Sequence, residues 1–137
     1  MISLLRSVFY VVTVLFFAAL VGCGSDGFEK VTGTVKYTDG TLPTSEMATI
    51  TFEPKEPGSD FKGASGDIGE DGTFELTTIE PGDGAMPGDY IVTVKIMDGY
   101  PDIVFAVEEK YTDVSQSPLS ATVTSGKNHF EFEVERP

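Results

Sequence analysis

Apolar and polar residues alternate in several short runs of this 137-residue chain, which is the pattern of half-buried β-strands. No run after residue 23 shows a convincing helical period. We expect a weaker strand at 62–68 and a short edge strand at 103–107. The alternating residues that we expect to face inward are Val31, Gly33, Val35, Tyr37, Ala48, Ile50, Phe52, Phe74, Leu76, Tyr90, Val92, Val94, Ile96, Leu119, Ala121, Val123, Phe130, Phe132 and Val134.

Short segments rich in Gly, Pro, Asp and Ser separate these runs. The segment 69–72 predicts a hairpin between the strands on either side, and 125–128 predicts a second hairpin at the end of the chain. Short strands separated by turn signals are typical of a β-sandwich. We therefore predict an all-β fold, a seven-stranded antiparallel β-sandwich over residues 29–137, preceded by an N-terminal signal helix.

Residues 1–22 have the layout of an export signal. One cation, Arg6, precedes an apolar stretch from Val8 to Leu20 that only Thr13 interrupts. That stretch is shorter than the roughly 20 residues that a membrane-spanning helix needs, although counting from Leu4 leaves an uncleaved membrane helix as an alternative. In either case Arg6 orients the rest of the chain outside the cytoplasm.

The only cysteine of the chain, Cys23, follows Leu20, Val21 and Gly22, and this run resembles a bacterial lipobox. Resemblance to bacterial lipoproteins implies a diacylglyceryl group on Cys23 and cleavage before it; the alternative is an ordinary thiol. Two acyl chains, at roughly 0.8 kcal/mol per buried CH₂, anchor a protein stably. Residues 23–28 would then be the anchor and spacer, and no cysteine would remain for a disulfide.

Three segments carry a further resemblance: Val31-Thr32-Gly33-Thr34-Val35, Gly69-Glu70-Asp71-Gly72-Thr73-Phe74-Glu75-Leu76 and Pro87-Gly88-Asp89-Tyr90. They resemble the carboxypeptidase-regulatory-like, or transthyretin-like, domain. With Gly82-Asp83-Gly84-Ala85, Glu109-Lys110-Tyr111 and Ser117-Pro118-Leu119, residues 20–137 look like small bacterial lipoproteins that carry this domain. The resemblance implies an Ig-like sandwich. Its motifs are turn and core positions, which specify a fold more than an activity.

The net charge of the chain limits the kinds of partner it can bind. Without residues 1–22, the chain has 8 cationic and 22 acidic side chains, which gives a net charge of −14. Such a surface repels nucleic acid and anionic lipid head groups, so we expect no nucleic-acid partner.

The sequence offers little chemistry for catalysis or metal binding. The single histidine, His129, is expected to face solvent beside Glu131 and Glu133. Asp67 and Asp71 superficially resemble a calcium loop, but glycine and threonine stand at ligand positions, and a hairpin turn explains them better. The glutamates at 131, 133 and 135 are expected to form a solvated face that Lys30 or Lys36 offsets. We therefore expect no enzyme, metal or cofactor.

Two loops are candidates for binding, residues 54–61 and residues 98–118, since binding sites on sandwiches lie in such loops. In the second, Tyr100, Phe105 and Tyr111 form a candidate ligand loop; the alternative is that they pack as a satellite of the core. We expect a non-catalytic lipid-anchored protein of the cell membrane or outer membrane whose β-sandwich is a binding or scaffolding domain, with an envelope protein or glycan as a possible partner. The alternatives are a carbohydrate- or peptide-binding accessory module of a separate enzyme, and a hydrolase.

Overall fold

The computed structural model describes residues 27–56, 58 and 62–137. The expected signal helix, Cys23 and the spacer as far as residue 26 lie outside the described residues, as does part of the loop 54–61. Within the described ranges, no helix is long and apolar enough to cross a membrane.

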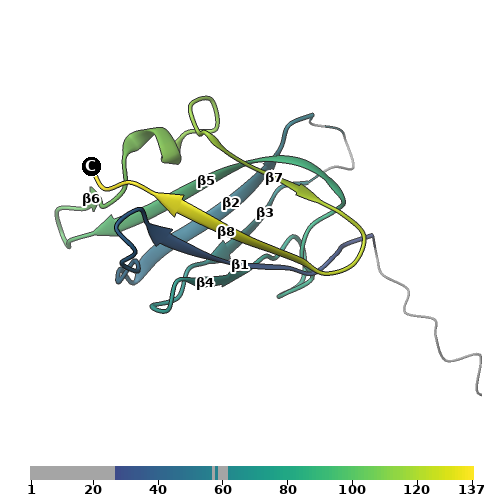
Figure 1. The fold of residues 1–137 in the computed structure, drawn as a ribbon, viewed down its shortest axis with the longest axis horizontal. Helices are drawn as coiled ribbons and strands as arrows, with labels where there is room; N and C mark the ends of the chain where they lie inside the picture. The colour runs from purple at the N-terminus through teal and green to yellow at the C-terminus, as the bar shows by residue number, and fades with distance from the viewer. Residues whose placement is uncertain (1–26, 57, 59–61) are drawn as a thin grey trace, which may run out of the picture.

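Two β-sheets form the described part of the chain, which confirms the predicted all-β class (Figure 1). One sheet has the order β4-β1-β8, and the other has the order β3-β2-β5-β6, with β7 also paired to β5. The described residues form eight strands where the sequence predicts seven. The elements are β1 Val31–Tyr37, β2 Met47–Pro54, β3 Ala64–Asp67, β4 Thr73–Glu75, β5 Gly88–Asp98, β6 Val104–Phe105, the short 3-10 helix η1 Glu109–Thr112, β7 Leu119–Val123 and β8 Asn128–Val134.

The expectation of a wholly antiparallel sandwich is wrong for one pair of strands. β1 and β8 lie side by side and run parallel, in register from Val31 opposite Asn128 to Tyr37 opposite Val134. These two strands are far apart in sequence, so no short hairpin has to join them, and long-range packing alone sets their relative direction.

The two predicted hairpin turns form, but they do not join paired strands as expected. Gly72 donates its N–H to the Gly69 carbonyl oxygen at 2.9 Å, yet β3 pairs with β2 while β4 pairs with β1. One isolated bridge, between Ser65 and Thr77, links the two sheets on that side. The turns therefore pass the chain from one sheet to the other.

The second turn, at residues 125–128, connects β7 in one sheet to β8 in the other, because β7 pairs with β5 and β8 pairs with β1. The buried side chain of Asn128 holds this turn. Its Oδ1 accepts the Thr124 N–H at 2.9 Å, and its Nδ2 donates to the carbonyl oxygens of Thr124 at 2.8 Å and Gly126 at 3.1 Å. Side-chain bonds of this kind satisfy backbone groups that no strand partner reaches.

The inward faces of the strands are as predicted, and an aromatic cluster fills the space between the sheets. Phe52 is fully buried at its centre, and its ring lies 6.4 Å from Phe74, 5.7 Å from Tyr90, 5.8 Å from Phe130 and 6.0 Å from Phe132 between centroids. These tilted and edge-on contacts are the favourable geometries for aromatic pairs. They bring side chains of both sheets into one core.

Gly33 makes room for this cluster on the inward face of β1. A Cβ atom at Gly33 would lie 2.5 Å from the Phe74 ring and 2.1 Å from the Phe130 carbonyl oxygen. The absence of a side chain at residue 33 thus lets Phe74 lie against the backbone of β1.

The strands run between two opposite ends of the sandwich. β1 begins at one end, where Glu29 forms a bridge with Ala85, and we call this end the N-terminal pole. At the opposite end β1 finishes, β2 begins and β5 runs into β6, and the C-terminus also lies there (Figure 1). We call this opposite end the distal pole.

Replacing Phe74 with alanine should lower the free energy of unfolding by roughly 3–5 kcal/mol, because it empties a site in the aromatic cluster. Ile79→Ala is the matched control, since Ile79 is 62% exposed and should change stability by no more than about 0.5 kcal/mol. Urea unfolding measures both. A loss below about 1 kcal/mol for Phe74→Ala would contradict the described packing.

Candidate functional site

The described residues offer no cluster of side chains for metal binding. No group of three or more His, Cys, Asp or Glu side chains among them is placed to hold a metal ion. His129 is exposed, as predicted, and its Nδ1 lies 3.1 Å from the Thr32 hydroxyl. Asp71 accepts the Thr73 N–H at 3.0 Å and hydroxyl at 2.7 Å, so its carboxylate is engaged within the predicted turn.

The outer face of β8 carries the expected glutamates. Glu131 and Glu133 are exposed, and Lys36 pairs with Glu133 at 3.4 Å across the parallel strands. This pair is exposed on both sides, so it contributes little to stability. The prediction of a solvated face offset by Lys36 therefore holds for Glu131 and Glu133, but it is wrong for Glu135, which lies beyond the end of β8, is partly buried and pairs with Lys110.

Tyr111 does not belong to an exposed loop surface. It lies in η1 with 5% of its surface exposed, and η1 packs against β5. Its hydroxyl donates to Glu135 Oε2 at 3.2 Å, while Lys110 pairs with the same carboxylate and holds the pKa of Glu135 below its usual range. For Tyr111, the alternative interpretation is therefore the correct one: its side chain packs against the core and is not part of an exposed binding loop.

Tyr100 and Phe105 do remain exposed, at 92% and 46% of their surfaces. They lie near Ile103, which is 52% exposed, around the end of β5 and the edge strand β6. Large apolar groups exposed together are uncommon on monomers and mark interaction sites. The structure therefore brings two of the three predicted ligand-loop residues together at the distal pole.

Met47 and Met97, which the sequence prediction did not include, lie beside these exposed residues. Met47 faces Met97 across β2 and β5, and Met97 faces Phe105 across β5 and β6, so the three side chains form one row. Their neighbours Ala48 and Ile96 are buried, which turns the row to the outer face of the sheet. We call the set Met47, Met97, Tyr100, Ile103 and Phe105 the distal surface.

A hollow of about 430 Å³ opens on this surface. Met47, Met97 and Tyr100 line it together with Gly99 and the polar residues Thr44, Ser45, Glu46 and Asp98. Ser45 donates its hydroxyl to the Met97 carbonyl oxygen and accepts the Met47 N–H at 3.1 Å, which ties the start of β2 to the end of β5. The hollow thus has an apolar side and a carboxylate-bearing rim on a fixed sheet.

Gly99 sets the position of Tyr100. Its φ of 86° lies in the left-handed region, and a Cβ there would meet the Asp102 carbonyl oxygen at 2.6 Å. Only glycine accepts that turn without strain. The close approach of Asp102 folds the segment back, so that Tyr100 projects from its tip.

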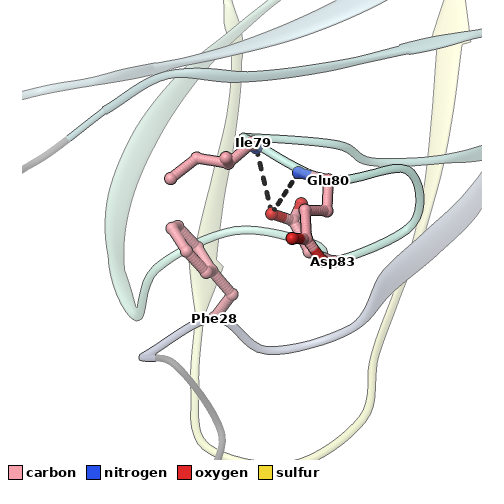
Figure 2. A pocket seen from close by; sticks show the side chains of 4 residues that line it. All are labelled: Phe28, Ile79, Glu80 and Asp83. Carbon is pink, nitrogen blue, oxygen red and sulfur yellow. Dashed lines mark hydrogen bonds between the residues drawn. The ribbon is translucent and has the colours of Figure 1, made fainter.

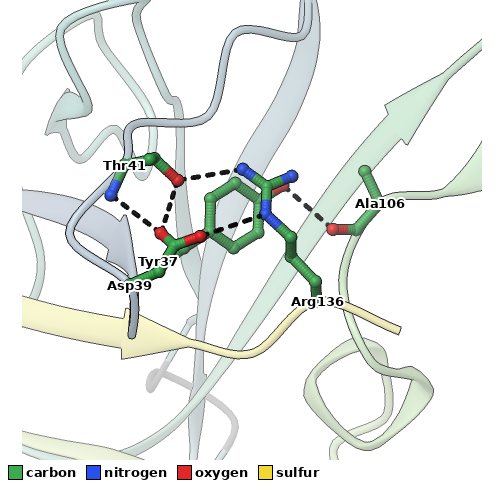
Figure 3. Close-up of polar contacts among 5 residues, drawn as sticks. All are labelled: Tyr37, Asp39, Thr41, Ala106 and Arg136. Atoms are coloured by element: carbon green, nitrogen blue, oxygen red, sulfur yellow. Dashed lines mark hydrogen bonds and ion pairs between the residues drawn. The ribbon is translucent and has the colours of Figure 1, made fainter.

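A set of contacts around Arg136 braces the segment that follows β6 (Figure 3). The guanidinium group lies 3.8 Å from the centre of the Tyr37 ring, 3.5 Å from Asp39 and 2.9 Å from the Thr41 hydroxyl. The Tyr37 hydroxyl donates to the Ala106 carbonyl oxygen at 2.9 Å, and burial raises the pKa of Tyr37. The cation of Arg136 is therefore already matched by Asp39.

A second hollow, of about 390 Å³, lies at the N-terminal pole between Phe28, Ile79, Glu80 and Asp83 (Figure 2). The Asp83 carboxylate accepts the backbone N–H groups of Thr78 at 2.7 Å, Glu80 at 2.9 Å and Ile79 at 3.0 Å. Burial alone would raise the pKa of Asp83, but these bonds outweigh it and hold the pKa below its usual range. Asp83 thus orders its own loop.

Tyr111→Ala should lower the free energy of unfolding by about 3 kcal/mol or more, because the ring is buried. Tyr100→Ala should change it by no more than about 0.5 kcal/mol, because that side chain touches solvent on nearly all sides. Tyr111→Phe keeps the ring and should lose about 1 kcal/mol with the bond to Glu135. Thermal and urea unfolding of the three variants would contradict the assignment if Tyr100→Ala proved the most destabilised.

Comparison with known proteins leaves the family of the chain open. No protein-family model matches it, and no curated protein matches it significantly. Among solved structures, it is similar to a DUF3823 family protein from Parabacteroides merdae ATCC 43184, with 19% sequence identity and a TM-score of 0.49. The match covers 79% of this chain but 46% of that one, so this chain corresponds to less than half of the other protein. A likeness of this degree carries no information on function.

Proposed function

We propose that this chain is a non-catalytic protein of the bacterial cell envelope, anchored by lipid on Cys23, whose sandwich presents the distal surface to a partner outside the cytoplasm. One observation carries the proposal: the exposed aromatic residues Tyr100 and Phe105 gather at the end of the sandwich opposite the point where the chain enters it. A binding surface at that end would face away from the membrane.

The dimensions of the chain support this arrangement. The five residue-to-residue steps from Cys23 to Phe28 span at most about 18 Å when fully extended, which would keep the N-terminal pole near the bilayer. β5 runs from Gly88 near that pole to Asp98 at the distal pole, and its length is about 33 Å. The distal surface would therefore stand clear of the lipid head groups.

The type of sandwich is part of the same proposal. We infer an Ig-like, transthyretin-like domain from the motif resemblance, and the corner before β5 supports it. The Tyr90 hydroxyl donates to the Met86 carbonyl oxygen, four residues upstream, at 2.6 Å, and burial raises the pKa of Tyr90 to about 12. A tyrosine hydroxyl bonded to backbone a few residues upstream is also found at a corner of Ig-like sandwiches.

A second candidate function is an accessory module that binds carbohydrate or peptide for a separate envelope enzyme. The 92% exposure of Tyr100 favours it, because an exposed aromatic ring offers a broad apolar face with a polar tip. Both candidates use the distal surface. They differ in whether the partner is a structural component or a substrate.

Replacing Cys23 with serine should move the protein from the membrane to the soluble fraction, or block its processing, because the acyl chains would have no thiol to join. Mass spectrometry of the native N-terminus and detergent phase partition measure the two effects. Ser25→Ala is the matched control and should leave both unchanged. An unmodified residue 23, or an intact Met1, in the native protein would refute the anchor.

The binding role predicts where contacts form in the native envelope. A photo-reactive amino acid at position 100 should cross-link to specific partners, whereas the same group at Glu131, on the outer face of the other sheet, should not. Mass spectrometry of the products is the measurement. Equal cross-linking from both positions, or none from position 100, would mean that the distal surface is not the binding site.

A further inference from the structure

We propose that the distal surface binds an extended, cationic polypeptide segment of another protein, an inference that rests on the proposed binding function of that surface. The apolar side chains of the segment would pack on the row Met47, Met97 and Phe105. Its lysines or arginines would pair with Glu46, Asp98 and Asp102. Three features of the distal pole carry this inference.

The first feature is the apolar row itself. Its members occupy directly opposed positions on three neighbouring strands, so their side chains are in reach of one another and form a continuous strip. Met47 is 37% exposed and Phe105 46%, and Met97 lies half-buried between them. Methionine side chains are unbranched and polarizable, which suits a surface that adapts to the side chains of a peptide.

The second feature is the charge around the row. Glu46, Asp98 and Asp102 are exposed, and none of the ion pairs between described residues involves them. Lys95 is the one cation on β2, β5 and β6. The rim therefore has an excess of negative charge, which is complementary to a cationic segment and draws it in from solution.

The third feature is the free edge of β6. Ala106 donates its N–H to the Ile96 carbonyl oxygen, so residues 106 and 96 form a hydrogen-bonded pair of the antiparallel ladder. Because such pairs alternate, the N–H and C=O of Phe105 point away from β5, and no described residue bonds to them. An extended segment added at this edge would place every second side chain on the face that carries the row, beside Phe105.

Other occupants fit less well. A second copy of the chain would bring the same three carboxylates against each other, and like charges facing one another oppose association. A lipid surface is disfavoured because the distal pole lies opposite the proposed anchor. A neutral glycan could stack on Tyr100 but would leave the carboxylates without a partner, and it is therefore tested as a competing outcome.

Binding to the full-length chain in non-ionic detergent tests the proposal. The probe is a fluorescent peptide that alternates lysine with valine over about ten residues, the upper end of the usual range of strand lengths, and the comparison peptide has glutamate in place of lysine. Fluorescence anisotropy should show binding of the lysine peptide alone. The affinity should fall at higher ionic strength, because exposed charges are screened.

Two sets of variants locate the site. The triple variant Glu46→Gln, Asp98→Asn, Asp102→Asn should bind the lysine peptide about tenfold more weakly, because it loses three surface ion pairs with the peptide. Its binding should also lose most of the salt dependence. The matched triple Glu56→Gln, Glu80→Gln, Glu131→Gln removes the same charge away from the distal pole and should bind nearly as the parent does. Phe105→Ser and Tyr100→Ala should each weaken binding, and Ile79→Ser at the other pole should not.

Tyr100→Ala keeps the test decisive if Phe105→Ser fails to fold, since Tyr100 contributes little to packing. Equal binding of both peptides, no binding of the lysine peptide, or equal loss in the two triple variants would overturn the inference. So would binding of a soluble N-acetylglucosamine oligomer that depends on Tyr100 and displaces the lysine peptide. If the lysine peptide fails to bind while position 100 still cross-links in the envelope, the inference is wrong and the proposed function stands.

Discussion

The contact of Phe52 with four other aromatic rings is the interaction on which the two sheets depend. Phe52 belongs to β2 in one sheet, and its neighbours include Phe74 and Phe132 from the other. The only cysteine, Cys23, precedes the sandwich, so no disulfide within the chain can join the sheets. Burial of apolar and aromatic surface has to supply the association that a disulfide supplies in many exported domains.

The core also determines the surface at the distal pole. Side chains alternate along a strand, so burying Ala48 and Ile96 obliges Met47 and Met97 to face outward. Pairing of β2 with β5 then places the two methionines opposite each other. The exposed strip is thus a consequence of how the strands pack, and the acidic residues around it lie at the end of β5 and in the neighbouring loops.

The alternation of residues predicts the strands and their buried faces because that period is a local property of the chain. It cannot predict partners, which is why the parallel pairing of β1 with β8 and the separation of β7 from β8 were missed. Tyr111 shows the same limit, since its burial depends on η1 packing against β5. The alternation of residues could have predicted that Met47 and Met97 face outward. That they lie opposite each other follows only from the register between β2 and β5, which the sequence does not show.

The parallel pairing of β1 with β8 has a mechanical consequence. The first and last strands lie side by side over seven residues of β1, with the start of one and the end of the other at opposite poles. A pull between the beginning and the end of the chain is therefore directed along these strands, and their hydrogen bonds are sheared together instead of opening one after another. Such a domain would resist being drawn out lengthwise far better than being peeled open from one edge.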